Sequence, residues 1–420
     1  MTGRLLVLGI SHQSAPVEVR ERLAIDDATW RAHAPAEPAT ILLSTCNRLE
    51  VYAWIEGRAE SVRRRLVRAL CRAAEMDLAD IEPYLTVRAG RDALLHLVRV
   101  SSGLDSLLVG EEQIRGQVRD ALRRGEDSQQ LHACLRGVFQ RAIESGRRVS
   151  GATRLGQVPS IAEAGVNVAR RAVTNDVRGQ LAVVLGAGVM ARAAVEALVA
   201  AGAHVRVLNR TPAHAERLMA HLRGAIEIDT LDALPEALRT AVLVVGATAA
   251  RTSVVSLAAI QTALRQRTLP LVLLDIALPR DVDPSVRGMP GVKLIDLDDL
   301  ERLCPVDTPT RKAEHERAEA LAVDEAARLA EWLRTRAVSP AITELRTYAE
   351  AVRMAELRRS AARLRDLTPE QIAAVEALTS GIVNKLMHGP TVALREASVS
   401  RSRTHILRVL RPRSSRGRSA

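Results

Sequence analysis

One short stretch of the chain has the residue types of a covalent catalyst. Two apolar runs, 41–43 and 49–55, are typical of strands, and the sequence STCNR lies between them. Cys46 therefore stands at a strand end, with Asn47 and Arg48 beside it. A thiol next to hydrogen-bond donors and a guanidinium is expected to have a stabilised thiolate, the nucleophilic form. A free cysteine is also a small apolar residue that is commonly buried in a core, and this segment alone leaves that alternative open.

A second stretch, VVLGAGVMARAAVEALVAAGAHVRVLNRT, has the pattern of a dinucleotide site. Glycines after a strand and before a helix allow a tight turn, and the helix N-terminus offers backbone N–H groups to a pyrophosphate. Arg210 stands where an NAD-dependent enzyme would have an acid, which favours the 2′-phosphate of NADPH. An α/β fold that binds no nucleotide is the alternative. The predicted cofactor-binding residues are Gly186, Ala187, Gly188, Val189, Met190, Ala191, Asn209, Arg210 and Thr211.

A nucleophilic cysteine combined with a hydride donor predicts a specific chemistry. The thiolate attacks an activated acyl group, the leaving group departs, and hydride reduces the resulting thioester to an aldehyde. The same groups could run the reaction in reverse and oxidise an aldehyde. The residues alone leave the direction open, although a preference for NADPH favours reduction.

The elements that must position these residues fall into three regions. Residues 1–150 mix short strands with helices at 59–74, 91–100 and 111–124, which predicts an α+β domain. Residues 160–303 alternate continuous apolar strands with helices, as expected of a parallel, Rossmann-type sheet covered on both faces. Residues 305–400 begin with a long helix at 309–338 and continue as further helices to about 396. The fold class is thus α/β plus α+β, with several domains.

The composition is that of a globular protein in a reducing compartment. The chain has 420 residues, of which 47% are hydrophobic and 26% charged. Its four cysteines have no disulfide or metal spacing, so we expect neither a disulfide framework nor a bound metal. No secretory signal or membrane span is predicted, which favours the cytoplasm. Residues 401–420 carry seven of the arginines behind a net charge of +11, and we expect this basic tail to be disordered.

A series of motifs in order along the chain resembles the glutamyl-tRNA reductase family. They are GISHQSAPVEVRERL at 9–23, STCNRLEVYA at 44–53, HLVRVSSGLDSLLVGEEQIRGQV at 96–118, LGAGVMA at 185–191, DIALPRDVDP at 275–284 and IVNKLMHGPTVALRE at 382–396. The resemblance implies reduction of a glutamyl-tRNA to glutamate-1-semialdehyde at the start of tetrapyrrole (porphyrin) synthesis. It also implies a catalytic domain, an NADPH domain, a spinal helix and a helical dimerisation domain.

The resemblance implies roles for particular residues. Cys46 matches the nucleophile, and His96 matches a histidine important for activity, so the resemblance implies a catalytic role near the thioester, as acid or as positioner. Without the resemblance, a histidine at this helical position is more often a core residue. Arg48 is the expected partner of the substrate's γ-carboxylate, because its planar fork can hold two oxygens. The predicted substrate-contacting residues are Thr45, Asn47, Arg48, Ser106, Glu111, Glu112, Gln113 and Gln117. His12 and the Asp275–Pro284 segment receive no catalytic role.

The partners implied are glutamyl-tRNA, a second copy of the chain, and the downstream aminomutase that receives the semialdehyde. Two alternatives from other classes stay open. One is a thioester or aldehyde oxidoreductase acting on a small acyl substrate, and the other is a non-catalytic tRNA-binding or regulatory paralogue. The intact Cys46, Arg48 and nucleotide glycines weigh against the second.

Overall fold

A computed structural model describes residues 3–107, 109–111, 113–128, 131–154, 160–173, 176–222, 224–250, 252–303 and 309–396. The predicted tail at 401–420, as well as Glu112 and Cys304, lie outside these residues. The chain divides into two compact units, one spanning Arg4–Ala326 and one beginning at Ala327, and each is described by itself.

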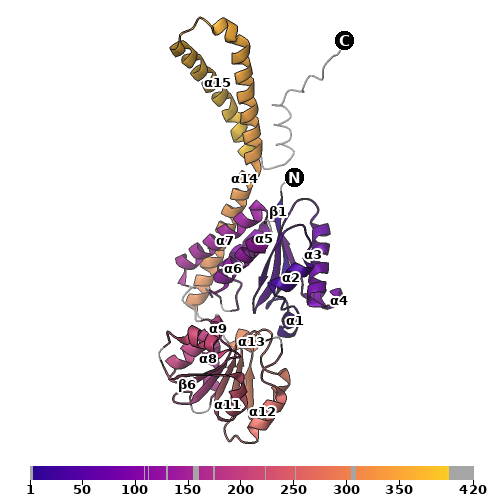
Figure 1. Ribbon diagram of the computed structural model, residues 1–420, viewed down its shortest axis with the longest axis vertical. Helices are drawn as coiled ribbons and strands as arrows, with labels where there is room; N and C mark the ends of the chain where they lie inside the picture. Colours follow the sequence, from indigo (N-terminus) through magenta and orange to yellow (C-terminus); the bar gives the residue numbers. More distant parts are fainter. Residues whose placement is uncertain are drawn as a thin grey trace. The chain divides into compact units, whose positions relative to one another are not determined.

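The first unit begins with an antiparallel sheet of four strands in the order β2-β3-β1-β4 (Figure 1). The strands are β1 (Arg4–Ser11), β2 (Thr40–Ser44), β3 (Arg48–Ile55) and β4 (Thr86–Ala89). The helices of this region are α1 (Val17–Arg22), α2 (Asp27–His33), α3 (Ala59–Ala74), α4 (Leu78–Ile81), α5 (Arg91–Ser101), α6 (Gln113–Ser128) and α7 (Ala133–Ala152), with a 3₁₀ turn at Glu82–Tyr84.

Apolar periodicity explains how this region packs. On α3 the buried residues Val62, Leu66 and Leu70 recur every four positions, which gives the helix one apolar stripe, and the stripe joins a core with the β1 and β3 side chains Leu6 and Val51. The predicted helix at 59–74 has these bounds in the structure, and the predicted α+β region is confirmed.

The second part of the first unit is a parallel sheet of six strands in the order β10-β9-β8-β5-β6-β7 (Figure 1). The strands are β5 (Leu181–Leu185), β6 (His204–Leu208), β7 (Ile226–Asp229), β8 (Leu243–Gly246), β9 (Leu271–Asp275) and β10 (Val292–Ile295). The helices are α8 (Ile161–Ala172), α9 (Val189–Ala200), α10 (Pro212–Met219), α11 (Leu234–Thr240), α12 (Leu257–Leu264) and α13 (Leu297–Leu303), with 3₁₀ turns at Leu231–Ala233 and Pro284–Val286. This strand order is that of the Rossmann fold, which confirms the predicted sheet.

Both faces of the parallel sheet are buried. Along β5, Ala182 and Val184 belong to one core cluster and Val183 and Leu185 to another, because successive side chains point to opposite faces. The strand order reverses between β5 and β8, and the crevice beyond the carboxyl ends of these two strands is where such sheets bind ligands.

The remaining helices are α14 (Pro309–Leu364) and α15 (Pro369–Glu396). The sequence predicted that the first would end at Val338, before Pro340, but α14 continues through that position to a length of 56 residues. In the second unit, the later part of α14 and α15 form a helical pair, in which Arg353 donates to Thr379 Oγ1 at 3.3 Å. No helix in the described ranges is long and apolar enough to cross a membrane.

Candidate active site

Cys46 lies in a short hairpin loop between β2 and β3. Thr45 N donates to the carbonyl of Arg48 at 2.9 Å, and Thr45 Oγ1 accepts from the backbone N–H groups of Asn47 and Arg48, both at 3.2 Å. The loop is also held from outside, since Arg20 Nη1 donates to the Cys46 carbonyl at 2.9 Å and His12 N donates to the Asn47 carbonyl at 2.8 Å. The threonine and asparagine around the cysteine thus fix the backbone that presents the thiol.

The surroundings of Cys46 favour the protonated thiol. Cys46 is partly exposed, yet its sulfur is enclosed closely enough that burial, reinforced by the negative charge of Glu111, raises the pKa of Cys46 to about 12. The positive charges of Arg20 and Arg48 offset only part of that rise. The expectation of a thiolate stabilised by its neighbours is therefore wrong for the free protein, and the thiol needs a proton acceptor to become a nucleophile.

Arg48 belongs to a buried network of charges behind the loop. It shares one face of β3 with Glu50 and Tyr52, and its guanidinium donates to Glu50 Oε1 at 3.1 Å and to the carbonyl of Asp105. His96 on α5 joins the same two acids, with Nε2 2.8 Å from Glu50 Oε1 and Nδ1 3.2 Å from Asp105 Oδ2. Tyr52 donates to Glu50 Oε2 at 2.5 Å.

The charges in this network balance one another. Burial alone would lower the pKa of His96, but Glu50 and Asp105 outweigh burial and raise it, so both ring nitrogens donate. Burial alone would raise the pKa of Glu50, but His96 and Arg48 outweigh it and hold the pKa at about 2. Two cations and two anions are therefore buried together, an arrangement that fixes the side chains because any single loss leaves an unpaired buried charge.

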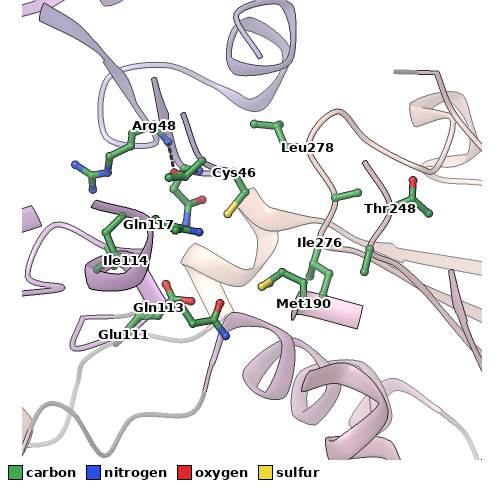
Figure 2. Close-up of a pocket in the computed structure, with 15 residues that line it drawn as sticks. Cys46, Arg48, Glu111, Gln113, Ile114, Gln117, Met190, Thr248, Ile276 and Leu278 are labelled. Atoms are coloured by element: carbon green, nitrogen blue, oxygen red, sulfur yellow. Dashed lines mark hydrogen bonds between the residues drawn. The ribbon is translucent and has the colours of Figure 1, made fainter. Parts of the chain in front are cut away.

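A pocket of about 180 Å³ joins the cysteine loop to the nucleotide sheet (Figure 2). Of the eight predicted substrate-contacting residues, the seven that the structure describes line it; they are Thr45, Asn47, Arg48, Ser106, Glu111, Gln113 and Gln117. His96 does not line the pocket; it lies in the buried network. The opposite wall comes from Met190, Ala247, Thr248, Ile276, Ala277 and Leu278, which follow strands β5, β8 and β9.

Glu111 is the acid of this pocket. Its side chain and the sulfur of Cys46 are both drawn in Figure 2, and its residue is 8% exposed. Burial raises the pKa of Glu111 to about 7, against the opposing effects of a hydrogen bond from the Ile161 backbone and the charge of Arg48. Glu111 and Cys46 line the same pocket, and a carboxyl that titrates near neutral pH is of the kind that can accept a proton from a thiol.

The glycine-rich turn after β5 fits a dinucleotide. Gly186 has φ +104° and lies so close to the end of the neighbouring strand β8 that a Cβ there would be 2.6 Å from the Ala247 carbonyl oxygen. Gly188 is the N-cap of α9 and has no atoms near the position that a Cβ would take, so a pyrophosphate can approach the helix N-terminus. At the end of β6, Arg210 and Thr211 are exposed, and Asn209 Nδ2 donates to the Thr211 carbonyl at 2.8 Å.

Contacts between the two sheets hold the pocket together. Arg20 on α1 donates to Asp298 on α13 at 2.5 Å while also holding the cysteine loop. Arg280, after β9, donates to Glu21 at 2.7 Å and to Glu18 at 3.1 Å. The walls of the pocket that come from the two sheets are thus joined by ion pairs.

Comparisons with known proteins agree with this geometry. Family models match at residues 8–153 (glutamyl-tRNA(Glu) reductase, N-terminal domain), 167–303 (shikimate/quinate 5-dehydrogenase) and 317–412 (glutamyl-tRNA(Glu) reductase, dimerisation domain). The chain is 36% identical over 416 residues to a glutamyl-tRNA reductase of Synechococcus, covering 97% of this chain and 96% of the relative. The chain belongs to the glutamyl-tRNA reductase family.

Two further relatives extend the comparison. A glutamyl-tRNA reductase of Rubrobacter xylanophilus is 39% identical, over 92% of this chain and 90% of its own. The solved structure of the Methanopyrus kandleri glutamyl-tRNA reductase is similar with a TM-score of 0.50 and 30% identity, covering 97% of this chain and 98% of that one. The similarity therefore extends over both sheets and the long helices.

Sequence reasoning missed the residues that support the site. Glu50 and Asp105 were not singled out, although Glu50 alternates with Arg48 on a strand expected to be buried, and a buried acid beside an arginine indicates a pair. Asp275 accepts from the backbone of Ala277 and Val282, at 3.1 and 2.8 Å. These bonds shape the turn that supplies Ile276 to Leu278 to the pocket, so the segment left without a catalytic role is a structural turn.

Proposed function

We propose that this chain is an NADPH-dependent oxidoreductase that converts glutamyl-tRNA to glutamate-1-semialdehyde through a thioester on Cys46, releasing tRNA. This is the first step of tetrapyrrole biosynthesis. The observation that carries the proposal is the pocket itself, in which a cysteine and the polar side chains of one domain face the ligand-binding crevice of a Rossmann sheet. We assign residues 1–150 to catalysis, 160–303 to NADPH and 305–400 to the spinal helix and dimerisation.

The first chemical step is acyl transfer to sulfur. Glu111 accepts the thiol proton as Cys46 Sγ attacks the acyl carbon, and it returns this proton to the ribose oxygen of the tRNA as the carbon–oxygen bond breaks. A glutamyl thioester and free tRNA result. General-base assistance is required here because the pKa of Cys46 is raised to about 12.

Two buried atoms that have no hydrogen-bond partner within the described residues support recognition of the glutamyl group. They are Asn47 Oδ1 and Arg48 Nε, and both residues line the pocket. We assign the Asn47 oxygen to the α-ammonium and the Arg48 guanidinium to the γ-carboxylate. Since Glu50 and Asp105 already occupy two nitrogens of Arg48, a single edge of its fork is left for the substrate.

We assign cofactor binding to the turn Gly186–Ala191, which would hold the pyrophosphate, and to Asn209, Arg210 and Thr211, which would hold the 2′-phosphate end. When bound, NADPH supplies the hydride that reduces the thioester to the aldehyde. His96, held between Glu50 and Asp105, acts as a positioning residue that keeps Arg48 in place.

The proposal includes a homodimer in a reducing cytoplasm, and the described cysteines, Cys46, Cys71 and Cys134, are not joined in disulfides. It also includes delivery of the reactive semialdehyde to the aminomutase that consumes it.

The experiment is NADPH oxidation with glutamyl-tRNA, with free glutamate and with a small glutamyl ester, for the natural chain and for Cys46→Ser. We expect oxidation with glutamyl-tRNA, none with free glutamate, and none in the variant, because a serine hydroxyl is a much weaker nucleophile than a thiol. Equal rates with the small ester would favour the small-acyl oxidoreductase. Binding of tRNA without turnover would favour the non-catalytic paralogue.

A further inference from the structure

Cys46 lies between two cavities. One is the catalytic pocket described above. The other, which we call the outer groove, has a volume of about 830 Å³ and shares Thr45, Cys46 and Leu278 with the pocket. Its floor includes Leu42 and Ser44 of β2, its sides come from residues around α1, α2 and the end of α3, and Ala249 and Pro279 complete it from the nucleotide domain.

The volumes of the two cavities limit the size of the ligand that each can hold. Pockets for drug-sized ligands are roughly 300–1,000 Å³, so the catalytic pocket at about 180 Å³ is too small for a glutamyl group together with a nucleoside. The outer groove at about 830 Å³ lies within that range. An aminoacyl ester whose acyl carbon is at Cys46 Sγ must therefore place its two halves in different cavities.

The chemistry decides which half goes where. The polar residues suited to the glutamyl group, Asn47, Gln113 and Gln117, line the catalytic pocket alone, and so does the Rossmann wall at Met190 and Thr248. Hydride must reach the acyl carbon from that wall. The tRNA is the leaving group and has to depart before hydride transfer. It must therefore lie on the other side of Cys46, which borders the outer groove.

The charged residues that line the groove further restrict the class of ligand it can bind. Its lining has four carboxylates, Glu21, Asp26, Asp27 and Glu75, and two guanidiniums, Arg22 and Arg124. Asp27 already pairs with Arg124 and Arg31, and Glu21 with Arg280. An excess of acids does not attract a phosphate backbone, whereas carboxylates accept hydrogen bonds from ribose hydroxyls and base amino groups.

We propose that the outer groove binds the 3′-terminal nucleoside of the tRNA and is the route by which the tRNA leaves after acyl transfer. This inference rests on the proposed function. It assigns residues outside the predicted site, in particular Ala24 and Thr29, to the fit of the leaving group.

The experiment compares two acyl donors without NADPH. One donor is glutamyl-tRNA, and the other is the glutamyl α-thioester of N-acetylcysteamine, from which Cys46 displaces the small thiol. Radiolabelled glutamate bound to the protein gives the rate of acylation. The variants Ala24→Trp and Thr29→Trp fill the groove, and Ala28→Trp is the matched control, since Ala28 is an exposed alanine of α2 that does not line the groove.

We expect both groove variants to slow acylation by glutamyl-tRNA about tenfold or more and acylation by the small thioester less than about twofold, because only the first donor needs the groove. Ala28→Trp should change neither rate. Unchanged tRNA rates in both groove variants, or equal losses with the two donors, would overturn the proposal. Failure of the natural chain to form any thioester would instead refute the proposed function.

Discussion

At the scale of single residues, a thiol with a raised pKa becomes a nucleophile only when a nearby group accepts its proton. Among the residues lining the catalytic pocket, Glu111 is the carboxyl, and burial places its pKa at about 7. Among the described residues, Cys46, Gln113 and Gln117 line the same pocket as Glu111, the backbone N–H of Ile161 donates a hydrogen bond to it, and the charge of Arg48 acts on it. If Glu111 is the base of the proposed mechanism, its charge at a given pH sets the rate at which the thiol reacts.

Glu111→Gln should slow acylation of Cys46 by about a hundredfold, the usual range for loss of a general base. Because the pKa of Glu111 is raised, the carboxyl is protonated below about pH 7 and accepts a proton only above it. The rate of acylation in the natural chain should therefore increase as pH rises through 7, and the variant should lack this increase. Single-turnover acylation by glutamyl-tRNA over that pH range measures it, with exposed Glu163→Gln as control. A variant whose rate still increases through pH 7 would show that another group accepts the proton.

Arg210→Glu should weaken binding of NADPH far more than that of NADH. A hydrogen bond to a charged group contributes about 1.5–3 kcal/mol, so the Michaelis constant for NADPH should rise about tenfold or more, while that for NADH changes little. Steady-state kinetics with both cofactors measures the effect, with Arg217→Glu, an exposed arginine on α10, as the control for charge. Equal effects on both cofactors would exclude a contact to the 2′-phosphate.

The residue scale also shows what a sequence can predict. Cys46, Gln113 and Gln117 could be predicted as site residues because the motif resemblance identifies individual residues without knowledge of the fold between them. The structure places all three in one pocket. The protonation of the thiol could not be predicted in the same way. It depends on burial and on where Arg48 points, and the guanidinium turns to Glu50 and Asp105 because two buried acids bind it more strongly than one partly exposed sulfur.

At the scale of elements, the beginning of α14 is anchored to the catalytic domain by its acids. Glu325 is 5% exposed and accepts from Ser145 at 2.7 Å and from Arg148 at 3.1 Å. Glu319 accepts from Arg99 at 2.5 Å, and Arg99 also donates to Asp105 of the buried network at 3.1 Å. The helix is therefore linked through two ion pairs to the residues that hold Arg48 and His96.

The sequence patterns underestimated the length of α14, which continues to Leu364. The predicted end at about Val338 lies two residues before Pro340, and a proline lacks a backbone N–H and normally ends or bends a helix. One side of α14, at Ala318, Ala322 and Ala326, is buried in the first unit, and tertiary packing of this kind stabilises a helix beyond its local propensity. The strands, by contrast, were predictable because a parallel sheet buried on both faces needs continuous apolar runs.

Glu325→Ala should destabilise the first unit by about 2 kcal/mol or more, because it leaves Ser145 buried without this acceptor and Arg148 without its main partner. Urea denaturation followed by circular dichroism measures the change. Glu316→Ala is the control, since Glu316 is an exposed acid on the same turns of α14 and its loss should cost less than about 0.5 kcal/mol. Equal effects of the two substitutions would show that the buried ion pair contributes nothing specific.

At the scale of the whole molecule, the helical pair of the second unit cannot cover its own apolar side chains. Large residues on the later part of α14 and on α15 are exposed, namely Val352, Met354, Ile372, Leu378, Ile382 and Leu386. Leu378 and Leu386 are 65% and 64% exposed. The family model for the dimerisation domain covers this region, at residues 317–412. Exposed apolar side chains gathered on a helical pair are typical of an interface with a second copy.

The double variant Leu378→Glu/Leu386→Glu should therefore sediment as a monomer, because two buried like charges on each copy would face each other across a two-fold interface. Leu78→Glu is the matched control: Leu78 is 47% exposed on α4, outside residues 340–400, and its substitution should leave the dimer intact. Analytical ultracentrifugation of the full chain distinguishes the two species, and truncation near residue 335 should give the same monomer. A double variant that stays dimeric would move the interface into the catalytic or nucleotide domain, where the pocket would then have to be reconsidered as a site shared between copies.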